Sequence, residues 1–138
     1  MSTIKTNTLT GTTSAGSIVV TGEGGSTTTN LQQGISKSWC VFDGTGTVSI
    51  TDSNNSTSLT DVEAGDYTLG FTNNMNSAAY VVSGSSVGSD AANYYNMLCG
   101  DGANNTTSVY EINFVHRTDS EGQIDNDHSG VVIHGDLA

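Results

Sequence analysis

The chain has 138 residues, of which 34% are hydrophobic and 12% charged, with 17 Gly and no Pro. This length fits one domain of ordinary size, and the small apolar fraction leaves a lone chain marginally stable, which favours oligomerisation. The net charge of −11, with only three Lys and Arg residues, excludes nucleic-acid binding and attachment to anionic membranes, because both need a cationic surface.

The first 34 residues are predicted to form an extended arm, because their composition differs from that of the rest. The strand-like pieces of the arm carry few apolar side chains, namely Ile4, Leu9, Ile18, Val19 and Val20. These are too few for a core, so we expect the arm to order by pairing with another chain or by docking on a partner. The alternative is a floppy tail. Residues 30–34 predict one helical turn, with Thr29 or Asn30 as its cap and Gly34 as its stop.

The sequence contains no signal for export or for membrane insertion. Residues 1–6 lack the apolar segment of a signal peptide, and no run approaches the ~18 apolar residues of a membrane span. We therefore expect synthesis in the cytoplasm of the producing cell. In that compartment Cys40 and Cys99 are expected to be buried thiols, with a disulfide between them as the alternative.

A β domain is predicted from residue 35 to residue 138. Residues 35–42 alternate in polarity with a period of two, which predicts a strand with Trp39 on one face. Residues 43–46 (Asp-Gly-Thr-Gly) predict a hairpin turn, because Asp-Gly tolerates the backbone angles that such turns need. Residues 52–57 predict a second polar turn.

The remaining strands are predicted from similar alternation, at residues 67–71, 79–83, 94–99, 108–117 and 131–134. In the longest of them Tyr110, Ile112, Phe114 and His116 share one face. Seven or eight short strands with hairpin-length connections predict an all-β fold, an antiparallel and jelly-roll-like β-sandwich, with a small barrel as the alternative.

Two groups of residues have the composition of metal sites. Calcium-loop spacing is found at Asp125, Asp127, Ser129, Gly130 and Asp136. However, a calcium loop of this type needs flanking helices, and residues 131–134 predict a strand, so a solvated turn is the expected structure. The second group is His116, His128 and His134, which zinc could bind, although a core histidine is the commoner role on the aromatic face of a strand.

No catalytic constellation is recognisable, so we expect no enzyme activity and no cofactor. A nucleophile elbow is absent, and the Gly-rich residues 22–25 lack the Lys and the following helix of a phosphate-binding loop. Surface recognition is a different role. Tyr94 and Tyr95 are adjacent, so in a strand one of them faces outward, where beside Asn96 it could stack on a sugar ring or join a subunit interface.

Three stretches of the sequence carry a resemblance to a known family. They are residues 2–11, residues 30–75 and residues 135–138, which read respectively STIKTNTLTG, NLQQGISKSWCVFDGTGTVSITDSNNSTSLTDVEAGDYTLGFTNNM and GDLA. In these stretches the chain resembles short tail-fibre and appendage proteins, or capsid-decoration proteins, of marine bacteriophages such as cyanophages and pelagiphages.

The resemblance implies a structural protein on the virion surface, a homotrimer in which the arm interlaces with sister chains or attaches to a capsid, portal, adaptor or tail protein. As a tail fibre, it would contact a host-surface glycan through loops such as 52–57 and 87–96. As a capsid decoration, it would bind the shell through the arm. A free carbohydrate-binding module, with Trp39 or Tyr94 and Tyr95 as stacking platforms, is the alternative from a different class.

Overall fold

The computed structural model describes residues 3–11, 18–22, 24–87, 96–99, 104–116 and 122–138. The chain divides into two compact units, Met1–Ile35 and Ser36–Ala138, so the division lies one residue from the predicted domain boundary. Among the described residues, no helix has the length and apolar character needed to cross a membrane.

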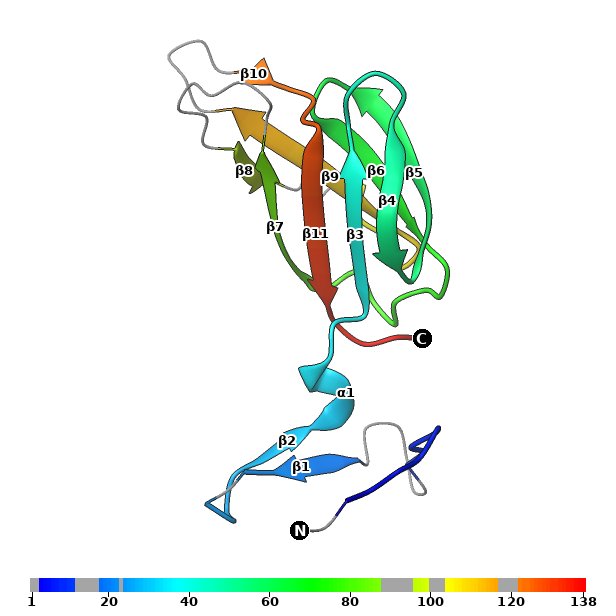
Figure 1. Cartoon of the computed structure of the whole chain (residues 1–138), viewed down its shortest axis with the longest axis vertical. Helices are drawn as coiled ribbons and strands as arrows, with labels where there is room; N and C mark the ends of the chain where they lie inside the picture. The colour runs from blue at the N-terminus through cyan, green and yellow to red at the C-terminus, as the bar shows by residue number, and fades with distance from the viewer. Residues whose placement is uncertain (1–2, 12–17, 23, 88–95, 100–103, 117–121) are drawn as a thin grey trace. The chain divides into compact units, whose positions relative to one another are not determined.

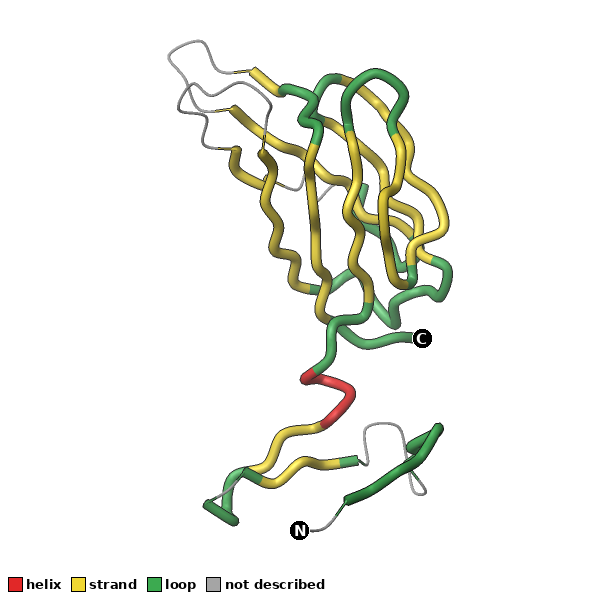
Figure 2. The backbone as a smooth tube through the Cα atoms, viewed as in Figure 1, coloured by secondary structure: helices red, strands yellow, loops and turns green. Residues whose placement is uncertain are grey.

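Unit 1 contains a small antiparallel hairpin followed by one helical turn (Figure 2). Strand β1 (Val19–Thr21) pairs with β2 (Thr28–Asn30), and the chain then enters α1 (Leu31–Gly34). Asn30 caps this helix, because its side-chain oxygen accepts hydrogen bonds from the backbone N–H groups of Gln32 and Gln33. The predicted helical turn and its Asn30 cap are therefore confirmed.

The part of unit 1 that the structure describes has no core. Residues 3–11 contain no strand, so the predicted strand-like piece around Ile4 and Leu9 is wrong, whereas the second piece corresponds to β1. None of the described residues between 3 and 35 is buried. A two-stranded hairpin of this kind is marginally stable in water unless it packs on something else.

Unit 2 consists of two antiparallel sheets that face each other (Figure 1). Sheet 1 consists, in order, of β4 (Ser49–Asn54), β3 (Ser38–Asp43), β11 (His128–His134) and β7 (Val81–Val87). Sheet 2 consists, in order, of β10 (Gly122–Gln123), β9 (Val109–His116), β6 (Asp66–Phe71) and β5 (Ser56–Glu63). Strand β8 (Asn96–Cys99) also pairs with β9. His116 pairs with both β8 and β10, so these two strands flank β9 on opposite edges.

The core lies between the two sheets. Alternate residues of β3 and β11 face alternate residues of β6 and β9, and the buried side chains from these four strands are Cys40, Phe42, Tyr67, Leu69, Phe71, Tyr110, Ile112, Phe114, Val131 and Ile133. The rings of Phe42 and Tyr67 meet edge to face across the sheets, with centroids 5.0 Å apart. Each fully buried Phe, Leu or Ile side chain stabilises the fold by roughly 1.5–3 kcal/mol. Two facing sheets around one core confirm the predicted all-β, antiparallel fold and exclude the barrel alternative for the described residues.

Some predicted boundaries are wrong. The described part of unit 2 contains nine strands, against the predicted seven or eight. Residues 52–57 are not a loop, because β4 and β5 continue through them and only Asn55 lies between the strands. Asn55 has a φ of 56° and carries the chain from sheet 1 to sheet 2. Asn tolerates this left-handed conformation, so Asn55 alone makes the change of direction that the polar composition assigned to a turn of residues 52–57.

Candidate functional site

The outer face of sheet 1 displays the residues that alternate with the core set. On β3 the half-buried residues Trp39 and Val41 point away from the core, and on β11 His128, Gly130 and Val132 do so. The register of the β3–β11 ladder pairs Trp39 with Val132, and Val41 with Gly130. On the other side of β11, Ser83 of β7 pairs with Val132, and Ser85 pairs with Gly130. These residues therefore share one face, although β3, β7 and β11 are far apart in the sequence.

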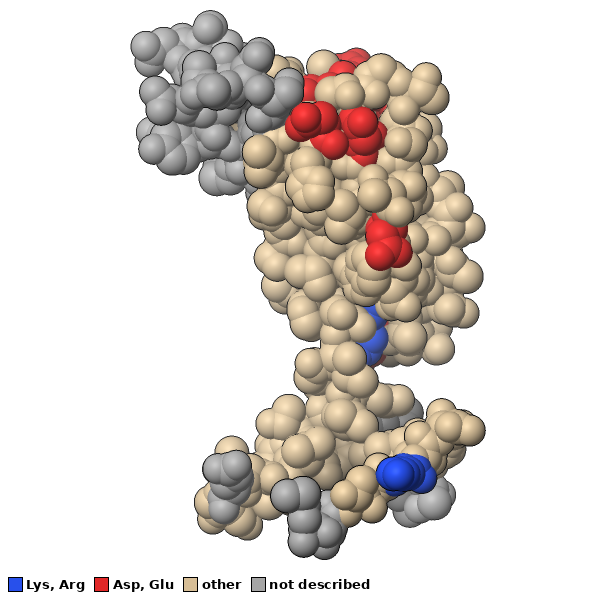
Figure 3. All heavy atoms as spheres, viewed as in Figure 1, with Lys and Arg blue, Asp and Glu red and all other residues tan. Residues whose placement is uncertain are grey.

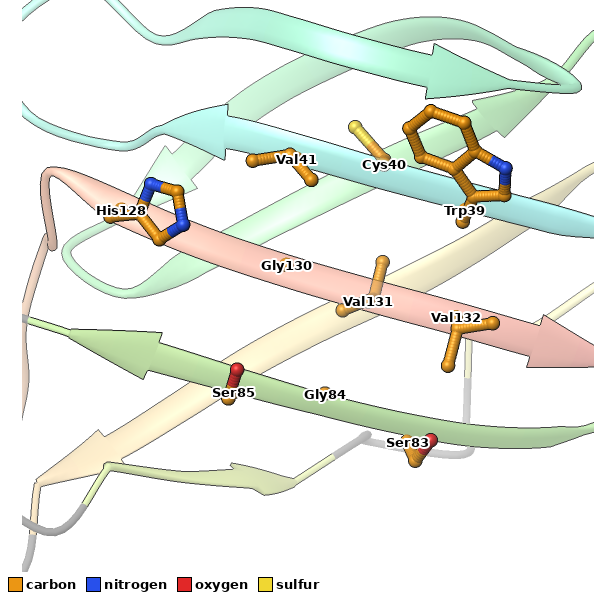
Figure 4. A pocket seen from close by; sticks show the side chains of 10 residues that line it. All are labelled: Trp39, Cys40, Val41, Ser83, Gly84, Ser85, His128, Gly130, Val131 and Val132. Atoms are coloured by element: carbon orange, nitrogen blue, oxygen red, sulfur yellow. The ribbon is translucent and has the colours of Figure 1, made fainter.

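A shallow groove of about 470 Å³ lies on this face. Gly130 forms its floor, because it has no side chain at the centre of the surrounding strands (Figure 4). Val41 borders the glycine on β3, and Ser85 borders it on β7. Cys40, Gly84 and Val131 also line the groove, but they belong to the inward-facing set of their strands. A volume of this size is in the range of small-molecule sites, roughly 300–1,000 Å³.

Trp39 and His128 mark the two ends of the groove. Val132, the ladder partner of Trp39, is four residues from His128 on β11, which corresponds to about 13 Å along a strand. Figure 4 looks onto the outer face of the sheet, and both the indole ring and the imidazole ring are seen broadly face-on. Trp39 is the only tryptophan of the chain. The arrangement offers aromatic faces at both ends and serine hydroxyls along one side.

The groove is uncharged. None of its lining residues is Asp, Glu, Lys or Arg. In the view of Figure 3, most of the outer face of sheet 1 is free of charged atoms, and acidic side chains gather near one end of unit 2. Asp43 at the end of β3 and Asp127 just before β11 belong to that end. A neutral groove in a chain of net charge −11 has no electrostatic attraction for an anionic ligand.

Asp125 has a structural role next to this acidic end. Its Oδ1 atom accepts hydrogen bonds from the backbone N–H of Gly65 at 2.8 Å and from the hydroxyl of Tyr67 at 2.7 Å. Burial raises the pKa of Tyr67 far above its usual range, and the hydrogen bond and charge of Asp125 raise this pKa further. The Asp125 carboxylate therefore anchors the turn at Gly65 and a buried phenol.

The calcium-like residues do not come together around one ion. Ser129 is completely buried within β11, where its hydroxyl lies 2.7 Å from that of Ser86. Asp127 and Asp136 lie beyond opposite ends of β11, a strand about 20 Å long at its usual rise per residue. A calcium loop must fold its ligands around the ion, so this alternative is wrong for the described geometry.

The histidines are also separated. His128 and His134 are exposed at opposite ends of β11, about 20 Å apart along the strand. His116 lies in β9, and its side chain is outside the described residues. Within the part of the chain that the structure describes, no three His, Cys, Asp or Glu side chains are grouped to hold a metal ion.

Cys40 is a free thiol that packs in the core with no exposed surface, and burial raises its pKa to about 11. This confirms the expectation of a buried thiol for Cys40. Cys99 lies in β8, where the side chains are outside the described residues. Asn96 begins the same strand and pairs with His116. Tyr94 and Tyr95, the predicted recognition residues, fall outside the described part of the chain.

The apolar residues of the arm are displayed rather than buried. Ile4 is 88% exposed and Leu9 is 61% exposed, while Val19 and Val20 are each 51% exposed. Ile18 is half-buried, and its carbonyl accepts a hydrogen bond from Leu31 N–H. Apolar side chains on this unit are therefore available to a partner surface.

Sequence reasoning identified Trp39 but missed the rest of the groove. The signal in β11 was the alternation of His128, Gly130 and Val132 against buried Ser129, Val131 and Ile133, with a glycine at an outward position. Gly130 instead belongs to the stretch with calcium-loop spacing, for which the sequence predicts a solvated turn. No protein-family model, curated protein or solved structure gives a significant match to this chain.

Proposed function

We propose that this chain is a non-enzymatic structural protein of a bacteriophage virion, displayed on the particle surface as a short trimeric fibre and attached through its N-terminal arm. The assembly rests on the exposed apolar side chains of unit 1 together with the lack of any buried residue among those described in that unit. Its phage origin rests on the sequence resemblance alone.

The contrast between the units supports attachment through unit 1 and display of unit 2. Unit 2 has a core with ring contacts across two sheets, whereas the hairpin of unit 1 offers Val19 and Val20 to the surroundings. An apolar hairpin without a core gains stability when another chain covers it. Three copies could supply that cover to one another, and a capsid or tail protein could supply it instead. In this proposal the sandwich is jelly-roll-like and faces outward.

Decoration of the capsid is the second candidate, because a shell protein could cover the same exposed apolar side chains of the arm instead. The two candidates differ in the partner of unit 1. A fibre protein would form its trimer in solution before attachment. The arm of a decoration protein would be covered only after it binds the shell.

Light scattering tests the proposal. For the full chain at micromolar concentration, we expect three times the 14.2 kDa mass of one chain, and for a chain lacking residues 2–30 we expect the monomer. A monomeric full chain that still binds purified particles through the arm supports decoration. Particle incorporation that survives the deletion contradicts attachment by the arm in either form.

A further inference from the structure

We propose that the groove on the outer face of sheet 1 binds a neutral oligosaccharide. The sugar would stack an apolar ring face on Trp39, lie over Gly130, and form hydrogen bonds with Ser83, Ser85 and His128. The biological role of this site, contact with a cell-surface glycan, rests on the display function proposed above. The groove itself lies wholly within unit 2, so binding and assembly can fail separately.

The chemistry of the lining selects this ligand class. A sugar ring has apolar C–H faces and a rim of hydroxyl groups, so it fits a site that combines an aromatic surface with neutral donors and acceptors. The groove has that combination, with Trp39 and Val132 on the apolar side and serine hydroxyls on the polar side. Phosphates and sulfated or acidic glycans are bound best by Lys and Arg side chains, and the groove is lined by neither.

The size of the groove argues against a protein partner. Ten residues line it, whereas a stable protein–protein interface needs about 20–30 residues on each side. The length between Trp39 and His128, about 13 Å from the strand rise, suits a short chain of sugar rings. The same size argument disfavours a second copy of the chain, and that occupant is one outcome of the test.

Gly130 provides a substitution that fills the groove and leaves the fold intact. A Cβ atom built on it would lie 3.7 Å from the carbonyl oxygen of Cys40 and 3.9 Å from Val41 Cγ2, both ordinary contacts. Valine also favours strands more than glycine does. Gly130→Val should therefore keep the sandwich folded while its side chain occupies the space above the floor.

The experiment screens the full chain against an array of neutral and acidic oligosaccharides, and then titrates the neutral trisaccharide that gives the strongest signal. Because Trp39 is the only tryptophan, its fluorescence reports the groove directly, and we expect a saturable change on titration. Calorimetry on Trp39→Ala, which lacks that reporter, and on Gly130→Val should show affinities lowered by at least about tenfold, the effect of roughly 1.4 kcal/mol. Val81→Ala is the matched control, because Val81 is 72% exposed on the same sheet and does not line the groove.

Four results would overturn the proposal. The first is that no neutral oligosaccharide changes the fluorescence, and the second is that Gly130→Val, shown to be folded by circular dichroism, binds like the parent chain. A third is a change of mass in light scattering for Gly130→Val, which would assign the groove to a second copy. Equal binding of acidic oligosaccharides would contradict the neutral class.

Discussion

Two glycines of unit 2 illustrate how much a single position decides. Gly130 has room for a side chain, as described above. At Gly44, a Cβ atom would lie 2.7 Å from Tyr67 Cζ, which is closer than real contacts allow, and 3.2 Å from the carbonyl oxygen of Asn126, which is tighter than most contacts. Tyr67 cannot retreat, because it is fully buried and its hydroxyl bonds to Asp125.

We therefore predict that Gly44→Ala lowers the free energy of unfolding by about 2–3 kcal/mol through overpacking. Gly130→Ala is the control, and it should leave stability unchanged or raise it by up to about 1 kcal/mol. Chemical denaturation of both variants measures the difference. Equal stability of the two would mean that Tyr67 has an alternative place in the core.

The buried thiol of Cys40 predicts a loss of stability in alkali. Below pH 9 this thiol is protonated in both the folded and the unfolded chain. Above pH 9 the unfolded chain ionises it, whereas burial holds the folded pKa at about 11, so the folded state binds more protons and its stability falls as pH rises.

Between pH 9 and pH 10, this one group should lower the free energy of unfolding by about 1 kcal/mol. Cys40→Ala removes that contribution but keeps those of the tyrosines, whose raised pKa values act mainly above pH 10. Denaturation curves of both proteins at the two pH values give the difference. If the two lose the same stability, Cys40 is accessible to solvent in the folded state.

At the scale of elements, the sequence identified the strands that carry large apolar residues at alternate positions. Strands β3, β6, β9 and β11 supply most of the core, and each was expected near its observed place. Strand β5 was missed, because Leu59 is its only side chain packed against the core and the rest reads as a polar linker. Strand β10 has only two residues, too few for any periodic signal.

The groove could not be predicted from the sequence, for a different reason. Local alternation places His128, Gly130 and Val132 on one face, but their position beside Trp39 depends on the pairing of β3 with β11. That pairing joins the first and last long strands of unit 2, and no short-range pattern encodes such a register. The position of Trp39 on one face of its strand was predictable from the sequence, whereas the residues beside it on β11 and β7 were not.

Asn55, the corner between β4 and β5, shows how one residue connects two sheets. Its φ of 56° is left-handed, and its side-chain oxygen accepts a hydrogen bond of 2.7 Å from the N–H of Asn73 while its amide donates to the Asn73 carbonyl at 3.0 Å. Asn55 Oδ1 also accepts a hydrogen bond of 3.1 Å from the side-chain amide of Asn73, so asparagine contributes both backbone tolerance and three side-chain hydrogen bonds to a distant loop.

The two contributions can be separated by substitution. Asn55→Gly keeps the conformation and loses the side-chain bonds, so we expect it to be destabilised by about 1 kcal/mol. Asn55→Ala also introduces left-handed strain and should lose about 1–2 kcal/mol more. Thermal and chemical denaturation compare the two variants, and an alanine variant as stable as the glycine variant would contradict a role for the backbone conformation.

At the scale of the whole molecule, the two units differ in where their apolar groups lie. Unit 2 places them between its sheets, while described residues of unit 1 leave them on the surface. This contrast is what composition predicted for the arm. In the proposed assembly, contacts between chains supply the free energy that unit 1 lacks within one chain.

The final prediction follows from this contrast and concerns the hairpin. In Val19→Ser/Val20→Ser, two side chains that are each 51% exposed lose their apolar groups. Exposed substitutions change stability by about 0.5 kcal/mol or less, so the denaturation curve of unit 2 should stay within that margin. If copies assemble through the hairpin, the mass measured by light scattering should fall to the 14.2 kDa of one chain. Val62→Ser is the matched control, since Val62 on β5 is 52% exposed, and it should keep the mass of the parent. A double variant that also keeps the parent mass would show that the hairpin does not hold the copies together.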